Sequence, residues 1–189
     1  MFTHKYKASI EGSKLFMREY DVLGDMNLFK FQTFLVNDLE FTPGIMVIFR
    51  GIKIDGSVQV YGLFDFGNGS MDSVTIDSLL NDDIIQLQFV YNLDNNKYIT
   101  LDYMGPSDYS PKSSYPQLVA EKGANPDQFA KKYEDLEIFS QSSSVSEDDE
   151  EFEEVVQDDA PEAFETKPFS SVSSYEEYVE YLKEKGFTV

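Results

Sequence analysis

The sequence contains no cysteine and no tryptophan, and it contains one histidine, His4. Without cysteine there can be no disulfides, no thiolate metal sites and no thiol nucleophile. His4 directly precedes Lys5 near the start of the chain, and the sequence assigns it no Cys or Ser partner for catalysis. We therefore expect neither redox, thiol nor histidine chemistry, and we predict no metal site and no cofactor.

Long apolar runs are also missing. No stretch of about 18 apolar residues is present, and no apolar run follows the basic residues near the N-terminus as it would in a secretory signal. A small protein without disulfide staples fits a reducing compartment. These absences predict a cytoplasmic protein with no bilayer span.

Positive charge is scarce, because 35 acidic residues face 15 basic ones and give a net charge of −20. Residues 138–189 hold 15 of the acidic residues and 3 of the basic ones, so this quarter of the chain carries −12. Such a surface repels nucleic acid and anionic membranes. We expect no direct nucleic-acid binding and no membrane binding, and a basic protein is the natural partner.

Aromatic residues are abundant instead, at 15% of the chain, with 16 Phe and 12 Tyr. Flat rings and β-branched residues suit sheets. Residues 1–106 predict a core domain with strands at 5–10, 15–22, 45–54, 58–64, 84–91 and 97–103, a helix at 27–39 and a helical turn at 73–80. The helix has Asn27 as its N-cap and an apolar stripe. The fold class is therefore α+β, a mainly antiparallel sheet in the order ββ-α-ββ-(α)-ββ with helices on one face.

Three further segments follow the core domain. Residues 107–136 predict a linker and an accessory helix, starting at Asn125 and Pro126, that packs on the core. Residues 137–172 are rich in Ser and then in Glu and Asp, which predicts an acidic disordered linker. Residues 173–187 predict a C-terminal amphipathic helix, with a capping box of Ser174 and Glu177 and a terminating Gly186.

Several landmarks in this order form a recognisable set. A strand ends at residues 20–22, a helix runs from Asn27 to Leu39, and a short helix covers 74–80. Later in the chain come a hairpin arm at 87–92 and the two segments Tyr115-Pro116-Gln117 and Gly123-Ala124-Asn125-Pro126. In these features the chain resembles the plasmid pRiA4b ORF-3-like family over about residues 3–130. The resemblance implies a compact α+β domain, often linked with mobile elements, without an established biochemical activity.

Two loops carry motif fragments that we interpret as turns. Asp65-Phe66-Gly67 copies the magnesium triplet of kinases, but the remaining kinase motifs are absent from the sequence. Asn92, Asp94 and Asn96 alternate like the opening of a calcium loop, but Lys97 stands where that loop needs glycine. A hairpin turn fits residues 93–96 better.

The C-terminal quarter holds the candidate binding residues. Acidic segments with embedded apolar anchors can dock onto basic, hydrophobic grooves. The residues proposed to contact a partner are Glu150, Glu151, Phe152, Glu153, Glu154 and Val155 in the acidic segment, and Tyr175, Tyr178 and Leu182 on the terminal helix. The helix could bind a partner, or it could fold back onto its own domain. A solvated, solubilising tail is the alternative for the acidic segment.

The leading hypothesis is a non-enzymatic protein-interaction module whose acidic tail and terminal helix bind a basic protein. A first alternative is an acidic DNA mimic that inhibits a nucleic-acid-binding protein, which requires an ordered row of carboxylates. A second alternative is a carboxylate-based hydrolase, which requires a pocket that holds buried carboxylates with opposed pKa values.

Overall fold

The structure is a computed structural model that describes residues 2–130 and 175–187. The predicted acidic linker, 137–172, lies outside the described residues, and with it Glu150, Glu151, Phe152, Glu153, Glu154 and Val155. Ser174 of the predicted capping box also lies outside them. No helix in the described part of the chain is long and apolar enough to cross a membrane.

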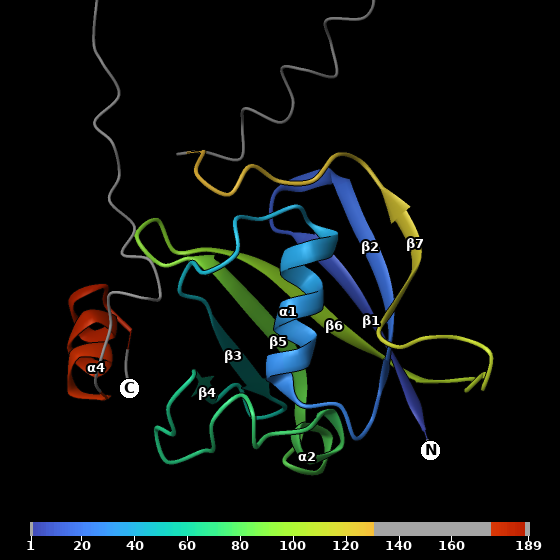
Figure 1. Ribbon diagram of the computed structural model, residues 1–189, viewed down its shortest axis with the longest axis horizontal. Helices are drawn as coiled ribbons and strands as arrows, with labels where there is room; N and C mark the ends of the chain where they lie inside the picture. Colours follow the sequence, from blue (N-terminus) through green and yellow to red (C-terminus); the bar gives the residue numbers. More distant parts are fainter. Residues whose placement is uncertain (1, 131–174, 188–189) are drawn as a thin grey trace, which may run out of the picture.

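One seven-stranded sheet with antiparallel pairing throughout organises the molecule, and its strand order is β4-β3-β5-β6-β1-β2-β7 (Figure 1). The strands are β1 (Thr3–Ile10), β2 (Ser13–Leu23), β3 (Ile48–Lys53), β4 (Val58–Tyr61), β5 (Ile84–Asn92), β6 (Lys97–Ser107) and β7 (Gln117–Lys122). The helices are α1 (Leu28–Asp38), α2 (Ile76–Asn81) and α4 (Tyr175–Glu184). The predicted α+β class with a mainly antiparallel sheet is confirmed.

Helix α1 forms where the sequence predicts it. The side chain of Asn27 accepts a hydrogen bond from the backbone N–H of Lys30, which caps the first turn. Leu28, Phe31 and Leu35 are buried against the sheet, so the apolar stripe faces the core. The helix ends at Asp38, one residue before the predicted end at residue 39.

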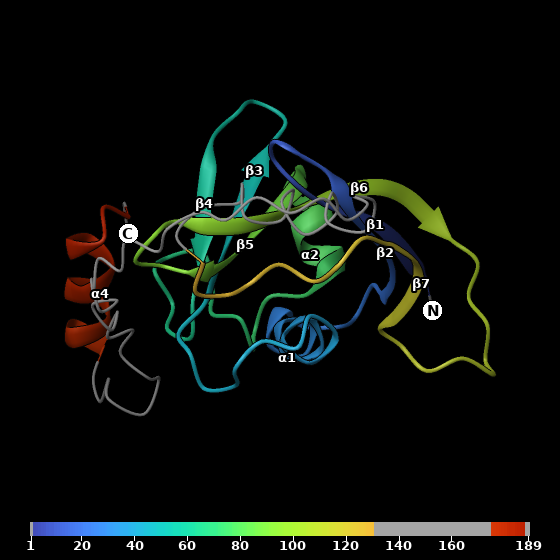
Figure 2. The same cartoon turned by 90° about the horizontal axis from the view of Figure 1, so that it is seen from above.

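The pleat of the sheet sends neighbouring residues into two different apolar clusters. Phe49 of β3 and its register partner Phe89 of β5 belong to the main core, which α1 and α2 cover. Ile48 and its partner Val90, one position away, belong instead to a second cluster that α4 completes. In both Figure 1 and Figure 2, α4 lies at the end of the sheet where β3 begins and β5 ends.

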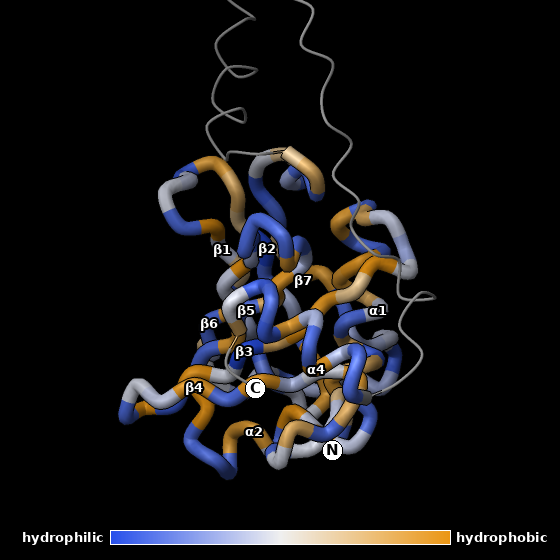
Figure 3. Tube along the Cα trace, turned by 90° about the vertical axis from the view of Figure 1, so that its left-hand side faces the viewer, coloured by the Kyte–Doolittle hydropathy of each residue, from blue (hydrophilic) through white to orange (hydrophobic). Residues whose placement is uncertain are grey.

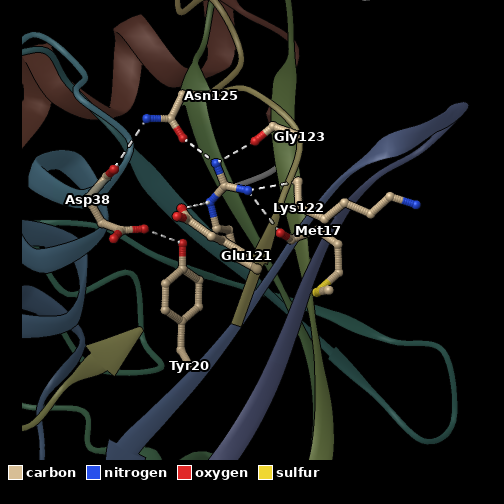
Figure 4. Close-up of polar contacts among 8 residues, drawn as sticks. Met17, Tyr20, Asp38, Glu121, Lys122, Gly123 and Asn125 are labelled. Carbon is tan, nitrogen blue, oxygen red and sulfur yellow. Dashed lines mark hydrogen bonds and ion pairs between the residues drawn. The ribbon is translucent and has the colours of Figure 1, made fainter. Parts of the chain in front are cut away.

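Strand β7 is the main departure from the prediction, since residues 107–136 predict a linker and an accessory helix but no strand. β7 pairs with β2, and the guanidinium of Arg18 fixes its end by donating hydrogen bonds to the carbonyl oxygens of Lys122 (2.8 Å) and Gly123 (3.0 Å). Arg18 also donates to Asn125 Oδ1 at 2.7 Å. Figure 4 shows these acceptors gathered around the guanidinium.

The helix predicted to start at Asn125 and Pro126 is absent from residues 125–130, and residues 131–136 lie outside the described chain. Asn125 ties this segment to the folded domain. Its side chain accepts from Arg18 and donates to the carbonyl oxygen of Asp38 at 3.3 Å, so it links β2 to the end of α1 (Figure 4). Asp127 Oδ1 accepts hydrogen bonds from the backbone N–H groups of Phe129 (2.8 Å) and Ala130 (3.2 Å), which is the pattern of a helix N-cap. The accessory helix therefore stays a prediction.

Candidate protein-interaction site at helix α4

Helix α4 has a well-defined C-terminal end. Gly186 has φ of +82°, the left-handed conformation that glycine adopts without a Cβ clash. The N–H of Phe187 donates to the carbonyl oxygen of Leu182, and the N–H of Gly186 donates to that of Lys183, both at 3.0 Å. This is a Schellman motif, and it places the ring of Phe187 beside Leu182 in the same cluster. The predicted role of Gly186 is confirmed.

The domain surface beneath α4 is apolar, and we call it the α4 groove. Its residues are Met46, Ile48, Val60, Phe64, Phe66, Val90, Leu93 and Tyr98. They come from the segment before β3, from β3, β4, the loop after β4 and the β5–β6 hairpin. Figure 3 looks onto this side of the molecule and shows hydrophobic and hydrophilic stretches alternating along the chain.

Tyr178 is the deepest anchor of α4, because none of its surface is exposed. Its ring stacks on Phe66 at a centroid distance of 5.5 Å and meets Phe64 at 5.4 Å. A Cβ at Gly62 would lie 2.6 Å from the Tyr178 hydroxyl oxygen, so only glycine leaves room for this phenol. Burial raises the pKa of Tyr178 above its usual value, which keeps the hydroxyl protonated.

Leu182 is also fully buried, and Phe187 extends the contact beyond the end of the helix. The Phe187 ring lies 5.7 Å from the guanidinium carbon of Arg50, and the Tyr98 ring lies 4.8 Å from the same carbon. Arg50 thus sits between two aromatic rings, a cation–π arrangement. Burial lowers the pKa of Arg50, and the nearby Tyr98 opposes that shift.

One ion pair fixes the position of α4 along the groove. Lys185 binds the carboxylate of Asp94, which lies in the turn between β5 and β6. The Asp94 side chain is 8% exposed, so the pair is largely shielded from water on the domain side. Burial, then Asp94, and then Glu184 raise the pKa of Tyr181, the neighbouring aromatic residue on α4, to about 12.

The structure brings two of the predicted contact residues together. Tyr178 and Leu182 lie on one buried face of α4, against the chain's own domain. Tyr175 is the first residue of α4. The terminal helix therefore docks in cis, one of the two outcomes left open by the sequence.

Sequence reasoning missed the groove side of the site. Arg50 and Asp94 are separated from α4 by more than 80 residues, and no local pattern connects them with it. Phe187 could have been identified, since an apolar residue directly after a terminating glycine is typical of a Schellman motif. Phe66 was assigned to a turn, and Asx geometry explains that turn, because Asp65 Oδ1 accepts from the N–H groups of Gly67 and Gly69.

Apolar contacts dominate this site. Apolar and aromatic side chains fill it, and one acidic and one basic residue of the domain add polarity and direction. In the described ranges, no three His, Asp or Glu side chains come together that could hold a metal ion. An amphipathic helix with two aromatic anchors, a leucine and a terminal basic residue is what this groove accommodates.

A polar cluster lies around His4, away from the α4 groove. Its Nε2 lies 2.8 Å from Asp77 Oδ1, and its Nδ1 lies 3.3 Å from the Tyr103 hydroxyl. These contacts join β1 with α2 and β6. The backbone N–H of Asp77 donates to the carbonyl oxygen of Gly24 at 2.8 Å, which fixes the carboxylate in place. The cluster is a structural link between the sheet and α2.

Comparisons with known proteins show a likeness of fold. No protein-family model matches the chain, and no curated protein matches it. Among solved structures, the chain is similar to a protein of unknown function, MM3350 from Methanosarcina mazei Go1. The TM-score is 0.63 at 15% sequence identity, over 74% of this chain and 82% of that one. At this identity the likeness shows a shared fold.

Proposed function

We propose that the chain is a non-enzymatic protein-interaction module in which α4 is an internal ligand for the α4 groove. The observation that carries this proposal is the second apolar cluster, which belongs to the sheet on one side and to a separate C-terminal helix on the other. A contiguous apolar surface that a detachable element covers is a typical protein-binding site. The helix-in-groove mode of peptide recognition has the same geometry.

The attachment of α4 suits reversible docking. Its contacts with the domain run through side chains, whereas the backbone hydrogen bonds of residues 185–187 close its own last turn. The segment between Ala130 and Tyr175 contains 44 residues, so the docking of α4 is intramolecular. A partner helix displaces α4 when the ratio of its concentration to its dissociation constant exceeds the same ratio for α4, for which the effective concentration is used.

The charges favour a basic partner. A competing helix must reproduce Lys185, since Asp94 would otherwise lose its counter-charge. The exposed residues of α4 include Glu176, Glu180 and Glu184, which the basic residues of a partner helix could replace without touching the groove. The acidic segment that contains Glu150 and Glu151 would steer such a partner and raise its association rate.

A synthetic α4 peptide, residues 173–189, tests the groove as a helix receptor. We expect the peptide at 100 µM to bind the full-length Leu182→Ala variant, in which the helix in cis is weakened, and to bind the natural chain poorly. A Glu180→Ala chain is the matched control, because Glu180 is exposed on the same helix. Equal binding to all three chains, or to none, would contradict the proposal.

The charge preference has its own test. A peptide with lysine at positions 176, 180 and 184 should bind the Leu182→Ala chain more tightly than the natural peptide at low salt. The difference should shrink as salt is added, because exposed charges are screened. The difference in affinity between the two peptides should largely disappear when Glu150, Glu151, Glu153 and Glu154 are replaced by glutamine. A preference that persists at 1 M salt would argue against steering by charge.

No observation favours the two alternatives over this proposal. The carboxylates that a DNA mimic would use lie largely in the acidic segment outside the described residues. The pocket between α1 and the segment before β3 has no carboxylate in its lining. Membership of the plasmid pRiA4b ORF-3-like family remains a prediction from the sequence motifs.

A further inference from the structure

A pocket of about 240 Å³ lies between α1 and the segment that leads into β3. Its lining comes from one side of α1, from residues 43–47, and from Leu63 and Met71. In Figures 1 and 2, the segment before β3 lies between α1 and α4. The pocket is therefore a neighbour of the α4 groove, separated from it by one stretch of chain.

The lining of this pocket is unusual for so acidic a chain. None of its twelve residues is charged, although the net charge of the protein is −20. The walls are mainly aliphatic, aromatic and thioether groups, and the Thr33 hydroxyl is engaged with the carbonyl oxygen of Phe29 at 2.9 Å. Gln32 and Asn37 add two side-chain amides, which can each donate and accept a hydrogen bond.

Size and polarity together define the ligand class. An apolar cavity of about 150 Å³ holds benzene, so this larger pocket has room for a molecule of about two fused rings or an equivalent branched chain. Burying an ionised group against an uncharged apolar wall is unfavourable. The ligand must then be neutral and mainly apolar, with one polar group directed at Gln32 or Asn37.

Two residues connect this pocket with the α4 groove. Met46 lines the pocket and also belongs to the α4 cluster. Leu63 lines the pocket and follows Gly62, and the Tyr178 hydroxyl rests against the backbone of both. A ligand that fills the pocket would support this shared wall from behind, so it would favour the docked position of Tyr178.

We propose that the pocket beside α1 binds a small, uncharged, mainly apolar molecule, and that its occupancy strengthens the docking of α4. The binding part is independent of the proposed function, whereas the coupling part rests on α4 being a reversible ligand. Coupling of this kind is reciprocal. The small molecule raises the docking equilibrium constant of α4 by some factor, and loss of docking lowers the affinity for the small molecule by the same factor.

The binding part is tested with a matched pair of probes, 2-naphthamide and 2-naphthoate, which differ mainly in charge. We titrate each into the full-length chain with ¹³C-labelled methionine methyl groups. The amide should shift the methyl signals of Met46 and Met71 and leave those of Met17 and Met104 in place. The carboxylate should bind at least tenfold more weakly.

Two variants locate the probe. Ile45→Phe places a ring into the pocket and should abolish the shifts, whereas Ile54→Phe is the control, because Ile54 is exposed and lies outside the lining. Shifts spread over all methionines, equal affinity for both probes, or unchanged binding in Ile45→Phe would each overturn the binding site.

The coupling is read from the Leu182→Ala chain. The amide should bind this chain several-fold more weakly than the natural chain. Saturating amide should raise the affinity of the α4 peptide for the groove of Leu182→Ala, because the peptide makes the same contacts with the shared wall. Equal affinity of the amide for both chains would refute the coupling. Binding of the α4 peptide to Leu182→Ala without any amide binding would refute the pocket while the proposed function stands.

Discussion

The replacement Leu182→Ala should release α4 from its groove while the main core stays folded. Leu182 is fully buried in the second cluster, and truncation of a buried leucine to alanine costs about 2–5 kcal/mol. That cost lowers the docking equilibrium by a factor of roughly 30 to several thousand. The main core contains no residue of α4, so its free energy of unfolding should change little.

Hydrogen exchange measures this release directly. A helix as short as α4 is marginal in water on its own, so an undocked α4 loses its helical hydrogen bonds as well. Amide protons of residues 179–187 should exchange far faster in Leu182→Ala than in the natural chain. Those of β5 should exchange at unchanged rates.

The control variant is Glu180→Ala, which alters the exposed side of the same helix. Exchange in this variant should match the natural chain within a few-fold. If Leu182→Ala left the α4 amides as protected as before, the buried contact would not hold the helix. If β5 lost protection in parallel, α4 would be part of the main core, and the separation into two clusters would be wrong.

Three further predictions concern other contacts. Gly62→Ala should also undock α4, because its Cβ would clash with Tyr178. Tyr178→Phe should relieve part of the clash. A double mutant whose α4 is docked no more tightly than in Gly62→Ala would refute this account. Gly24→Ala should lower the free energy of unfolding, measured in urea, by about 1–3 kcal/mol, because its Cβ would clash with Asp77 Oδ1 and break the contact of Asp77 with His4. Adding Asp77→Ala to this variant should lower the stability little further, and strictly additive losses would contradict the explanation. Docking of α4, followed by hydrogen exchange, should weaken as the pH rises from 10 to 12. Tyr181 has a pKa of about 12 when docked and about 10 when free, so it loses its proton first in the undocked state, which is thereby favoured. Tyr181→Phe should move the loss of docking to higher pH, and an unchanged pH profile would argue against a role of Tyr181.

Local signals in the sequence predicted much of the main core. The Asn27 cap and the stripe of Leu28, Phe31 and Leu35 define α1, and the structure has the helix there. Strand β7 escaped prediction because its position depends on pairing with β2 and on Arg18, which lies about a hundred residues away. Such long-range contacts leave no periodicity in a short segment.

The same distinction applies to the candidate site. The spacing of Tyr178 and Leu182 revealed one apolar face of the terminal helix, and both residues are buried. Their surroundings depend on residues brought together by folding, such as Arg50 and Asp94, whose partners no sequence pattern identifies. His4 shows this as well, since its contact with Asp77 spans 73 residues.

The position of α4 at the end of the chain has a consequence for synthesis. The main core is complete in sequence once residue 130 has been made, but 57 more residues must be translated before Phe187 joins the polypeptide. At about 5–20 residues per second this takes roughly 3–11 s. Throughout that interval α4 cannot cover the apolar surface of the α4 groove, so a partner that reaches the nascent domain meets no competition from the helix.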